Sequence, residues 1–199
     1  MRRVAIMMAA IASTLALPAA AQDRPPLTPT RDVSVTYRAE GGGPNSGEMR
    51  LSWLNAEKKM RMDLPGGAGW SLTDMRSGQV VMVMEAQRMV MELPRDPSSA
   101  NPAQPSPTAR FTRGGTETVL GHRCTVWRYE DGEHRGEACV TAEGIMLRSQ
   151  ASSGGHRGSM TATEVAFGPQ DPARFRVPAG YRSMQMPGMP NSGGGPPSR

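Results

Sequence analysis

Methionine is the residue type in this sequence with the most distinctive chemistry, because the chain of 199 residues holds 16 of them. A thioether sulfur is a soft ligand that suits Cu(I). Three methionines, Met184, Met186 and Met189, stand in a segment rich in Pro and Gly near the C-terminus, where burial would not account for them. They are the candidate metal ligands of the chain. The alternative is a tail that is rich in methionine without any role for the sulfur atoms.

A second group of methionines stands in segments where apolar and polar residues alternate. Its members are Met60, Met62, Met82, Met84, Met89 and Met91. Alternating residues of a strand point to one face, so these side chains line a common surface if the registers of the hairpins agree. Because methionine is flexible and recurs at apolar binding surfaces, the six residues are candidates for binding an acyl chain or another elongated apolar ligand. The alternative is that they form the core of a two-sided sheet.

The residue types of common active sites are scattered. The histidines, His122, His134 and His156, are dispersed, and the sequence has no metalloprotease, nucleophile-elbow, phosphate-loop or dinucleotide motif. The carboxylates stand apart at strand ends, so no pair suited to acid and base catalysis can be assigned. We therefore expect a protein that is not an enzyme, with no catalytic residue and no cofactor.

The N-terminus has the pattern of a secretory signal peptide. Arg2 and Arg3 precede an apolar run that is too short to span a membrane, and small residues follow it as far as Ala21. Cleavage after Ala21 predicts an exported protein of the bacterial periplasm, without a transmembrane anchor. It lowers the formal net charge from +5 by two, to +3. This small excess is spread along the chain, so no nucleic-acid partner is expected.

The two cysteines, Cys124 and Cys139, are predicted to form one structural disulfide. An exported chain meets oxidising conditions. A catalytic dithiol more usually shows a C-x-x-C spacing, and a zinc site needs further ligands.

Segments rich in Pro, Gly and Ser divide the chain. We expect a signal peptide (1–21), a disordered linker (22–30), one β domain (31–182) with a Pro-rich loop (95–110), and a disordered tail rich in Met, Gly and Pro (183–199). The structured blocks total about 135 residues, which is the size of one domain. Their alternation predicts an antiparallel meander of eight or nine strands with little helix.

The chain resembles the exported domains of unknown function that are grouped with the LolA/LolB-like (outer-membrane lipoprotein carrier-like) superfamily. The resemblance rests on DVSVTYR, MRLSWLNAEKKMRMDLP, VVMVMEAQRMVMELP, LGHRCTVWRYE and DPARFRVPAGY. It implies a curved, unclosed antiparallel half-barrel with an apolar concave side. LolA and LolB carry the acyl chains of lipoproteins through the periplasm.

These observations predict a non-catalytic periplasmic protein that binds an apolar, acyl-like or lipid-like ligand on the concave face of its sheet. Two alternatives stay open. One is copper binding through the methionine-rich tail, and the other is an envelope module that acts through a protein partner.

Overall fold

Alternation of apolar and polar residues produces a structure made almost entirely of strands. The computed structural model describes residues 24–41, 46–93 and 108–184. Within these residues, twelve strands form one sheet, and the helical content is limited to two short 3-10 turns, Pro65–Gly67 and Pro172–Phe175. The mainly β class with little helix is confirmed, whereas the expected number of strands was too low.

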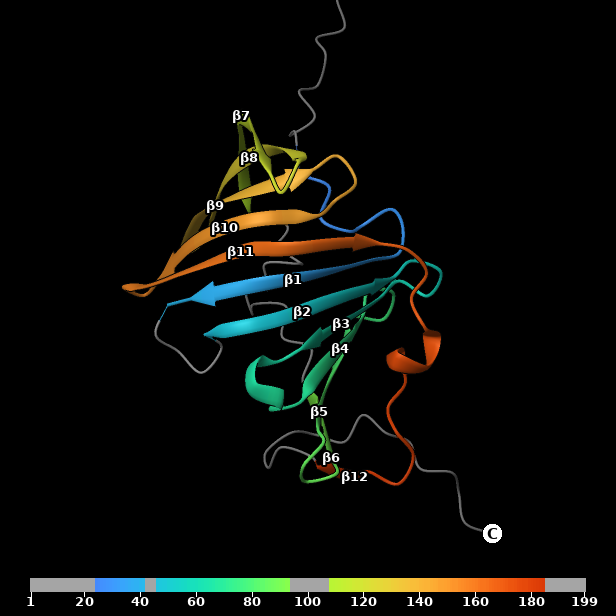
Figure 1. Cartoon of the computed structure of the whole chain (residues 1–199). Coiled ribbons are helices and arrows are strands. Elements are labelled where there is room, and N and C mark those ends of the chain that lie inside the picture. Colours follow the sequence, from blue (N-terminus) through green and yellow to red (C-terminus); the bar gives the residue numbers. More distant parts are fainter. Residues whose placement is uncertain (1–23, 42–45, 94–107, 185–199) are drawn as a thin grey trace, which may run out of the picture.

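The sheet consists of two antiparallel meanders that meet at its centre (Figure 1). The first contains β1 (Val33–Glu40), β2 (Gly47–Leu54), β3 (Lys59–Asp63), β4 (Trp70–Asp74), β5 (Gln79–Met84) and β6 (Met89–Leu93). The second contains β7 (Arg110–Val119), β8 (His122–Asp131), β9 (His134–Thr141), β10 (Met146–Ser153) and β11 (His156–Phe167). Pairing of β1 with β11 joins them, and β12 (Arg182–Met184) adds a parallel strand beside β6.

The sequence did not indicate two of these strands. Most residues of β7 are exposed, and the strand lacks apolar alternation because nearly all of its residues are polar or glycine; the pair Gly114 and Gly115 stands at a register shift. The second, β12, has only three residues, and two of them, Ser183 and Met184, lie in the segment expected to belong to the tail. Both lie at edges of the sheet, where the apolar pattern is weakest.

Three hairpins of the first meander have turns of the same length, four residues. Their turns span residues 55–58, 75–78 and 85–88, and each ends on a residue with positive φ: Lys58, Gly78 or Arg88. Gly78 adopts this conformation without steric cost, because it lacks a Cβ atom. Turns of equal length preserve the alternation of side chains from one strand to the next, which matters for the methionines described below.

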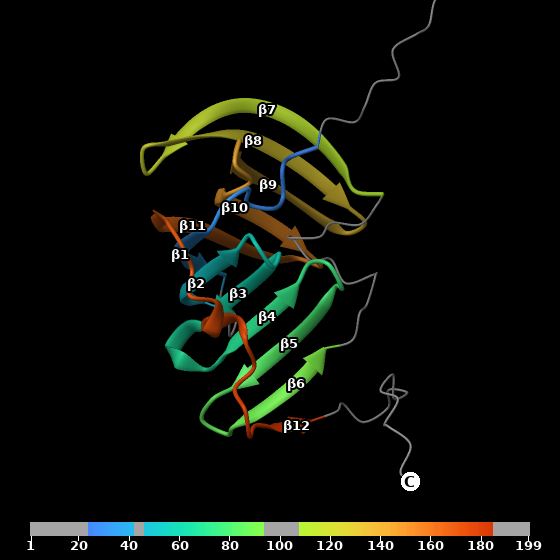
Figure 2. The same cartoon turned by 90° about the vertical axis from the view of Figure 1, so that its right-hand side faces the viewer.

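The sheet curves into an open C, with β7 at one end and β6 and β12 at the other (Figure 2). A buried cluster lies inside the curve and combines residues of β1 and β2, such as Val33 and Trp53, with residues of β8 and β10, such as Val126 and Leu147. Strands that are several positions apart in one sheet share a cluster only if the sheet bends toward it. The predicted unclosed half-barrel is therefore confirmed.

The segment expected to be a disordered linker is described from Arg24 onward and lies against the second meander. The backbone N–H of Thr30 donates to the carbonyl of Glu143, and the guanidinium of Arg24 donates to the carbonyl of Ala109. Gly144 permits this approach, because a Cβ atom there would collide with the carbonyl of Thr28. Ala109, within the range expected to be a loop, is buried.

The predicted disulfide between Cys124 and Cys139 is confirmed. It joins the neighbouring strands β8 and β9, with the two Cα atoms 5.3 Å apart, and both cysteines are buried. The bond closes a loop of 15 residues around the β8–β9 hairpin.

Reduction of this disulfide is expected to lower the free energy of unfolding by about 3 kcal/mol, since the reduced unfolded chain gains conformational entropy. Urea unfolding of the mature protein with and without reductant measures the change. The variant Cys124→Ala/Cys139→Ala is the control, because reductant should leave its midpoint unchanged. A wild-type midpoint that does not move on reduction would contradict a stabilising role.

Candidate functional site

The strand methionines of β5 and β6 form two cross-strand pairs. Met82 lies opposite Met91, and Met84 lies opposite Met89. Residues directly opposite each other in an antiparallel pair have neighbouring Cβ atoms on the same face of the sheet. Because Met82 and Met84 are two positions apart on one strand, both pairs lie on the same face.

The methionines of β3 belong to that face as well. Met62 lies opposite Ser71 of β4, and Ser71 lies opposite Met82 of β5. Met60 is two positions before Met62 on the same strand and shares its orientation. The structure therefore brings all six candidate methionines onto one surface, which we call the methionine face.

The methionine face is the inner face of the curved sheet. Met60 lies opposite Trp53, Trp53 opposite Val33, and Val33 opposite Phe167 of β11, so all four side chains lie on the same side. The ring of Phe167 contacts that of His122 in β8, with centroids 5.8 Å apart. Two strands separate β8 from β11 in the sheet, so this contact requires the sheet to curve toward that side.

The two faces of β3 to β6 differ in how completely they are covered. All six methionines of the methionine face are half-buried. On the outer face, Val83 is 0% exposed and Trp70 is 2% exposed, in a cluster completed by Phe175 and Tyr181 of the C-terminal segment. Polypeptide thus seals the outer face, while each inner methionine keeps part of its surface accessible.

Ion pairs fix the C-terminal segment over the outer face. Arg176 donates two hydrogen bonds to Glu57, at 2.5 and 2.6 Å. Arg174 donates to Asp63 at 3.0 Å, and Arg61 donates both to Asp63 and to the carbonyl of Arg174. We call these ion pairs and hydrogen bonds the clasp. The clasp holds the C-terminal segment in the position where Phe175 packs into the outer cluster.

The clasp also changes the acidity of Glu57. Hydrogen bonds from Arg176, and then from Lys59, lower the pKa of the Glu57 carboxyl from 4.5 to about 2. Elsewhere, burial raises the pKa of Tyr37, whose hydroxyl donates to the carbonyl of Met146 at 2.7 Å. Tyr37 is therefore a neutral structural residue that links β1 to β10.

A shallow depression lies at the far end of β1, on the inner side of the sheet. It measures about 270 Å³, and its lining includes Ala39, Met49 and Met160. Ala39 lies opposite Met160, and Met49 lies opposite Tyr37, so these side chains continue the inner face beyond the six methionines. Met160 could not be recognised from the sequence, because a β-bulge in β11 shifts the alternation of that strand.

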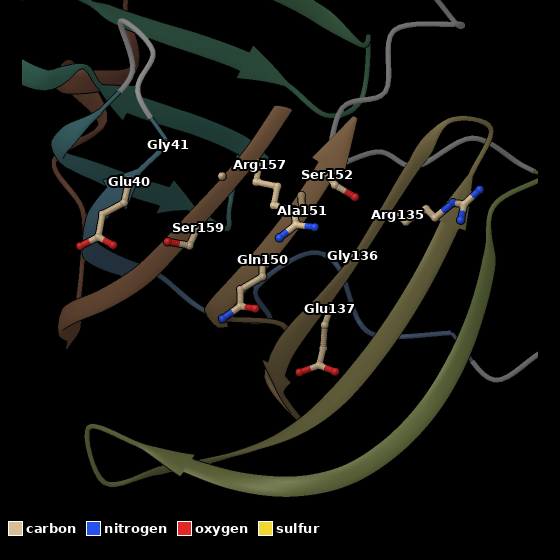
Figure 3. Close-up of a pocket in the computed structure, with 11 residues that line it drawn as sticks. Glu40, Gly41, Arg135, Gly136, Glu137, Gln150, Ala151, Ser152, Arg157 and Ser159 are labelled. Atoms are coloured by element: carbon tan, nitrogen blue, oxygen red, sulfur yellow. The ribbon is translucent and has the colours of Figure 1, made fainter. Parts of the chain in front are cut away.

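A second depression, of about 600 Å³, is open and is lined mostly by polar residues and glycines (Figure 3). Four of its residues follow one register row across four strands: Glu40, Ser159, Gln150 and Glu137. None of the candidate methionines lines it. Its lining contains both acidic and basic groups and no buried polar group aimed into the space, so it does not define a binding chemistry.

The candidate metal ligands of the tail are only partly described. Met184 lies in β12 and is 44% exposed, whereas Met186 and Met189 lie outside the described residues. Within the described ranges, no group of three or more His, Cys, Asp and Glu could hold a metal ion.

No helix in the part of the chain that the structure describes is long and apolar enough to cross a membrane.

The fold and the inner face define a class of protein, an unclosed antiparallel half-barrel with an apolar concave side. The chain belongs to the family described as "Domain of unknown function (DUF4412)", which matches residues 43–146, just over half of its length. The prediction of a domain of unknown function is thereby confirmed, as is the predicted unclosed half-barrel. No curated protein sequence matches the chain.

Solved structures share the fold at low sequence identity. An uncharacterized conserved protein from Thermus thermophilus is 10% identical, with a TM-score of 0.54 over 79% of this chain and 91% of that one. The MucA/MucB complex of Pseudomonas aeruginosa contains a chain that is 15% identical, with a TM-score of 0.52 over 74% of this chain and 56% of that one. This chain thus spans little more than half of that relative, and the likeness concerns the fold alone.

The lowered pKa of Glu57 predicts a dependence of stability on pH. A carboxyl whose pKa is lower in the folded state stabilises the fold above its unfolded pKa, and this contribution is lost as the pH falls from about 4.5 toward 2. The unfolding midpoint of the wild type should therefore decrease through this window. Thermal unfolding at a series of pH values measures the decrease.

The variant Glu57→Gln should show a flatter profile over the same pH window and a lower stability than the wild type at neutral pH. Some slope should remain, because backbone N–H groups, first that of Ser77, also lower the pKa of Asp74. Superimposable profiles for the variant and the wild type would show that the clasp does not contribute to stability.

Proposed function

We propose that this protein is a non-catalytic periplasmic protein that binds an elongated apolar ligand, such as an acyl chain, on its methionine face. The observation that carries the proposal is the contrast between the two faces of β3 to β6. Tyr181 and Phe175 cover the outer face, whereas the inner face presents six half-buried methionines. A guest chain would complete the burial of this surface.

The dimensions of the methionine face suit such a guest. Met62 on β3 and Met91 on β6 are three strand spacings apart, which is about 14 Å. The depression at Met49 and Met160 extends the apolar surface along β1 and β2. Methionine adapts to guests of different shape, because its side chain is unbranched and has three rotatable bonds.

The expected affinity is moderate. Each buried methylene contributes about 0.8 kcal/mol, so a chain of about a dozen carbons contributes about 10 kcal/mol when it is fully buried. Association costs about 4 kcal/mol or more in lost translational and rotational freedom. The remainder corresponds to binding in the micromolar range or weaker, without any polar contact.

The exported location is supported by the signal-like N-terminus and by the disulfide between Cys124 and Cys139.

A protein partner is the second candidate function. It is favoured by one comparison, because MucB, which shares the fold, has been solved in complex with MucA.

Glutamate at the centre of the methionine face should abolish binding of an apolar probe. In Met82→Glu/Met91→Glu, two charges replace thioethers that lie directly opposite each other, and their desolvation would oppose entry of the probe. Titration with a fluorescent fatty-acid analogue measures the loss.

The matched control is Thr116→Glu/Thr118→Glu, which adds the same two charges at exposed positions of β7 and should bind the probe as the wild type does. Circular dichroism and a thiol assay check that both variants are folded and carry the disulfide. If repulsion between the glutamates unfolds the first variant, Met82→Gln/Met91→Gln replaces it. Unchanged probe binding in the folded variant would overturn the proposal.

A further inference from the structure

The strand β12 adds a third thioether to the pair formed by Met82 and Met91. Met184 is the parallel partner of Met91 on β6, and Met91 is the antiparallel partner of Met82 on β5. The three methionines therefore form one row across three adjacent strands. The sequence gives no hint of this row, because Met184 is 93 positions after Met91.

The orientation of Met184 follows from its neighbours in the chain. Tyr181 packs into the outer cluster, and Ser183 is the partner of Val90, which belongs to that cluster. Side chains alternate along a strand, so Arg182 and Met184 lie on the opposite, inner side. The thioether of Met184 thus shares the face of Met82 and Met91.

The spacing of the row allows the sulfur atoms to meet at one ion. Adjacent strands are about 4.8 Å apart, and a methionine side chain can lean toward its neighbours through three rotatable bonds. Met184 is 44% exposed and the other two methionines are half-buried, so an ion can reach the row from solvent at the edge of the sheet. The pair Met84 and Met89 lies two residues from the pair Met82 and Met91 along β5 and β6, and it can supply a further thioether.

The chemistry of the row selects a soft monovalent ion. Thioethers are neutral and polarizable, and they favour Cu(I) over hard cations, which prefer oxygen ligands. The guanidinium of Arg182, whose residue is the partner of Met89, disfavours a divalent ion more strongly than a monovalent one.

We propose that Met82, Met91 and Met184 form a Cu(I) site at the inner edge of the sheet. The site differs from a tail site made by Met184, Met186 and Met189, because β5 and β6 supply two of its three ligands. A bound ion also ties β12 to β5 and β6, so the metal stabilises the attachment of the C-terminal strand.

Anaerobic titration of the full mature chain with Cu(I), in competition with a chromogenic chelator, tests the site. The wild type should bind one ion per chain, and Met82→Leu/Met91→Leu/Met184→Leu should lose it. The loss of affinity should exceed the roughly 10- to 100-fold typical of losing a supporting contact around a metal. Leucine keeps the volume and the apolar character of methionine, so the variant should fold.

Two controls locate the ligands. Met49→Leu/Met60→Leu/Met62→Leu removes three thioethers from the same face outside the row, and Met186→Leu/Met189→Leu removes those of the tail; both should bind Cu(I) as the wild type does. An unchanged affinity in the row variant, or an equal loss in either control, would overturn the proposal.

A second readout follows the sulfur atoms directly. In protein labelled with ¹³C at the methionine methyl groups, Ag(I), a redox-stable substitute for Cu(I), should shift the resonances of Met82, Met91 and Met184. Shifts confined to Met186 and Met189 would contradict the site. The row variant should still bind the fatty-acid analogue, because leucine preserves the apolar surface, so failure of the metal site and failure of the proposed apolar function give different results.

Discussion

A single sheet with apolar side chains on both faces must cover both of them, and this constraint organises the whole molecule. On β3 to β6 the alternation places Trp70 and Val83 on one side and Met62 and Met82 on the other. The outer side is covered by the C-terminal segment, which the ion pair of Glu57 with Arg176 holds in place. The inner side is covered only in part, by curvature of the sheet around the cluster that contains Val33 and Trp53.

The different fates of the two faces explain why we locate function on the inner one. A surface sealed by its own chain has completed its packing, and exchange with a ligand would require the clasp to open. A half-buried surface of flexible side chains gains free energy when a guest covers it. The row of Met82, Met91 and Met184 adds a property that apolarity alone would not give, because its sulfur atoms can also act as soft ligands.

Much of the fold follows from the sequence, because alternation of apolar and polar residues identifies most strands. The signal-like N-terminus indicates an oxidising compartment, which predicts the disulfide between Cys124 and Cys139. The edge strand β7 escaped prediction because its exposed residues carry no apolar pattern, and Met160 escaped because a β-bulge shifts its parity. Alternation could nominate the six methionines but could not place them on one face, which depends on register. The parallel pairing of Met184 with Met91 joins residues far apart in sequence, and no local pattern encodes it.

If the inner face holds an apolar guest, native mass spectrometry will detect that guest as an added mass. The protein would be expressed in a bacterium that exports it to the periplasm. The mature form would be purified without detergent and transferred gently to the gas phase. We expect an added mass of a few hundred daltons that organic solvent extracts, as for a molecule with about a dozen or more methylenes. A mass equal to that of the polypeptide alone, both before and after extraction, would contradict this expectation.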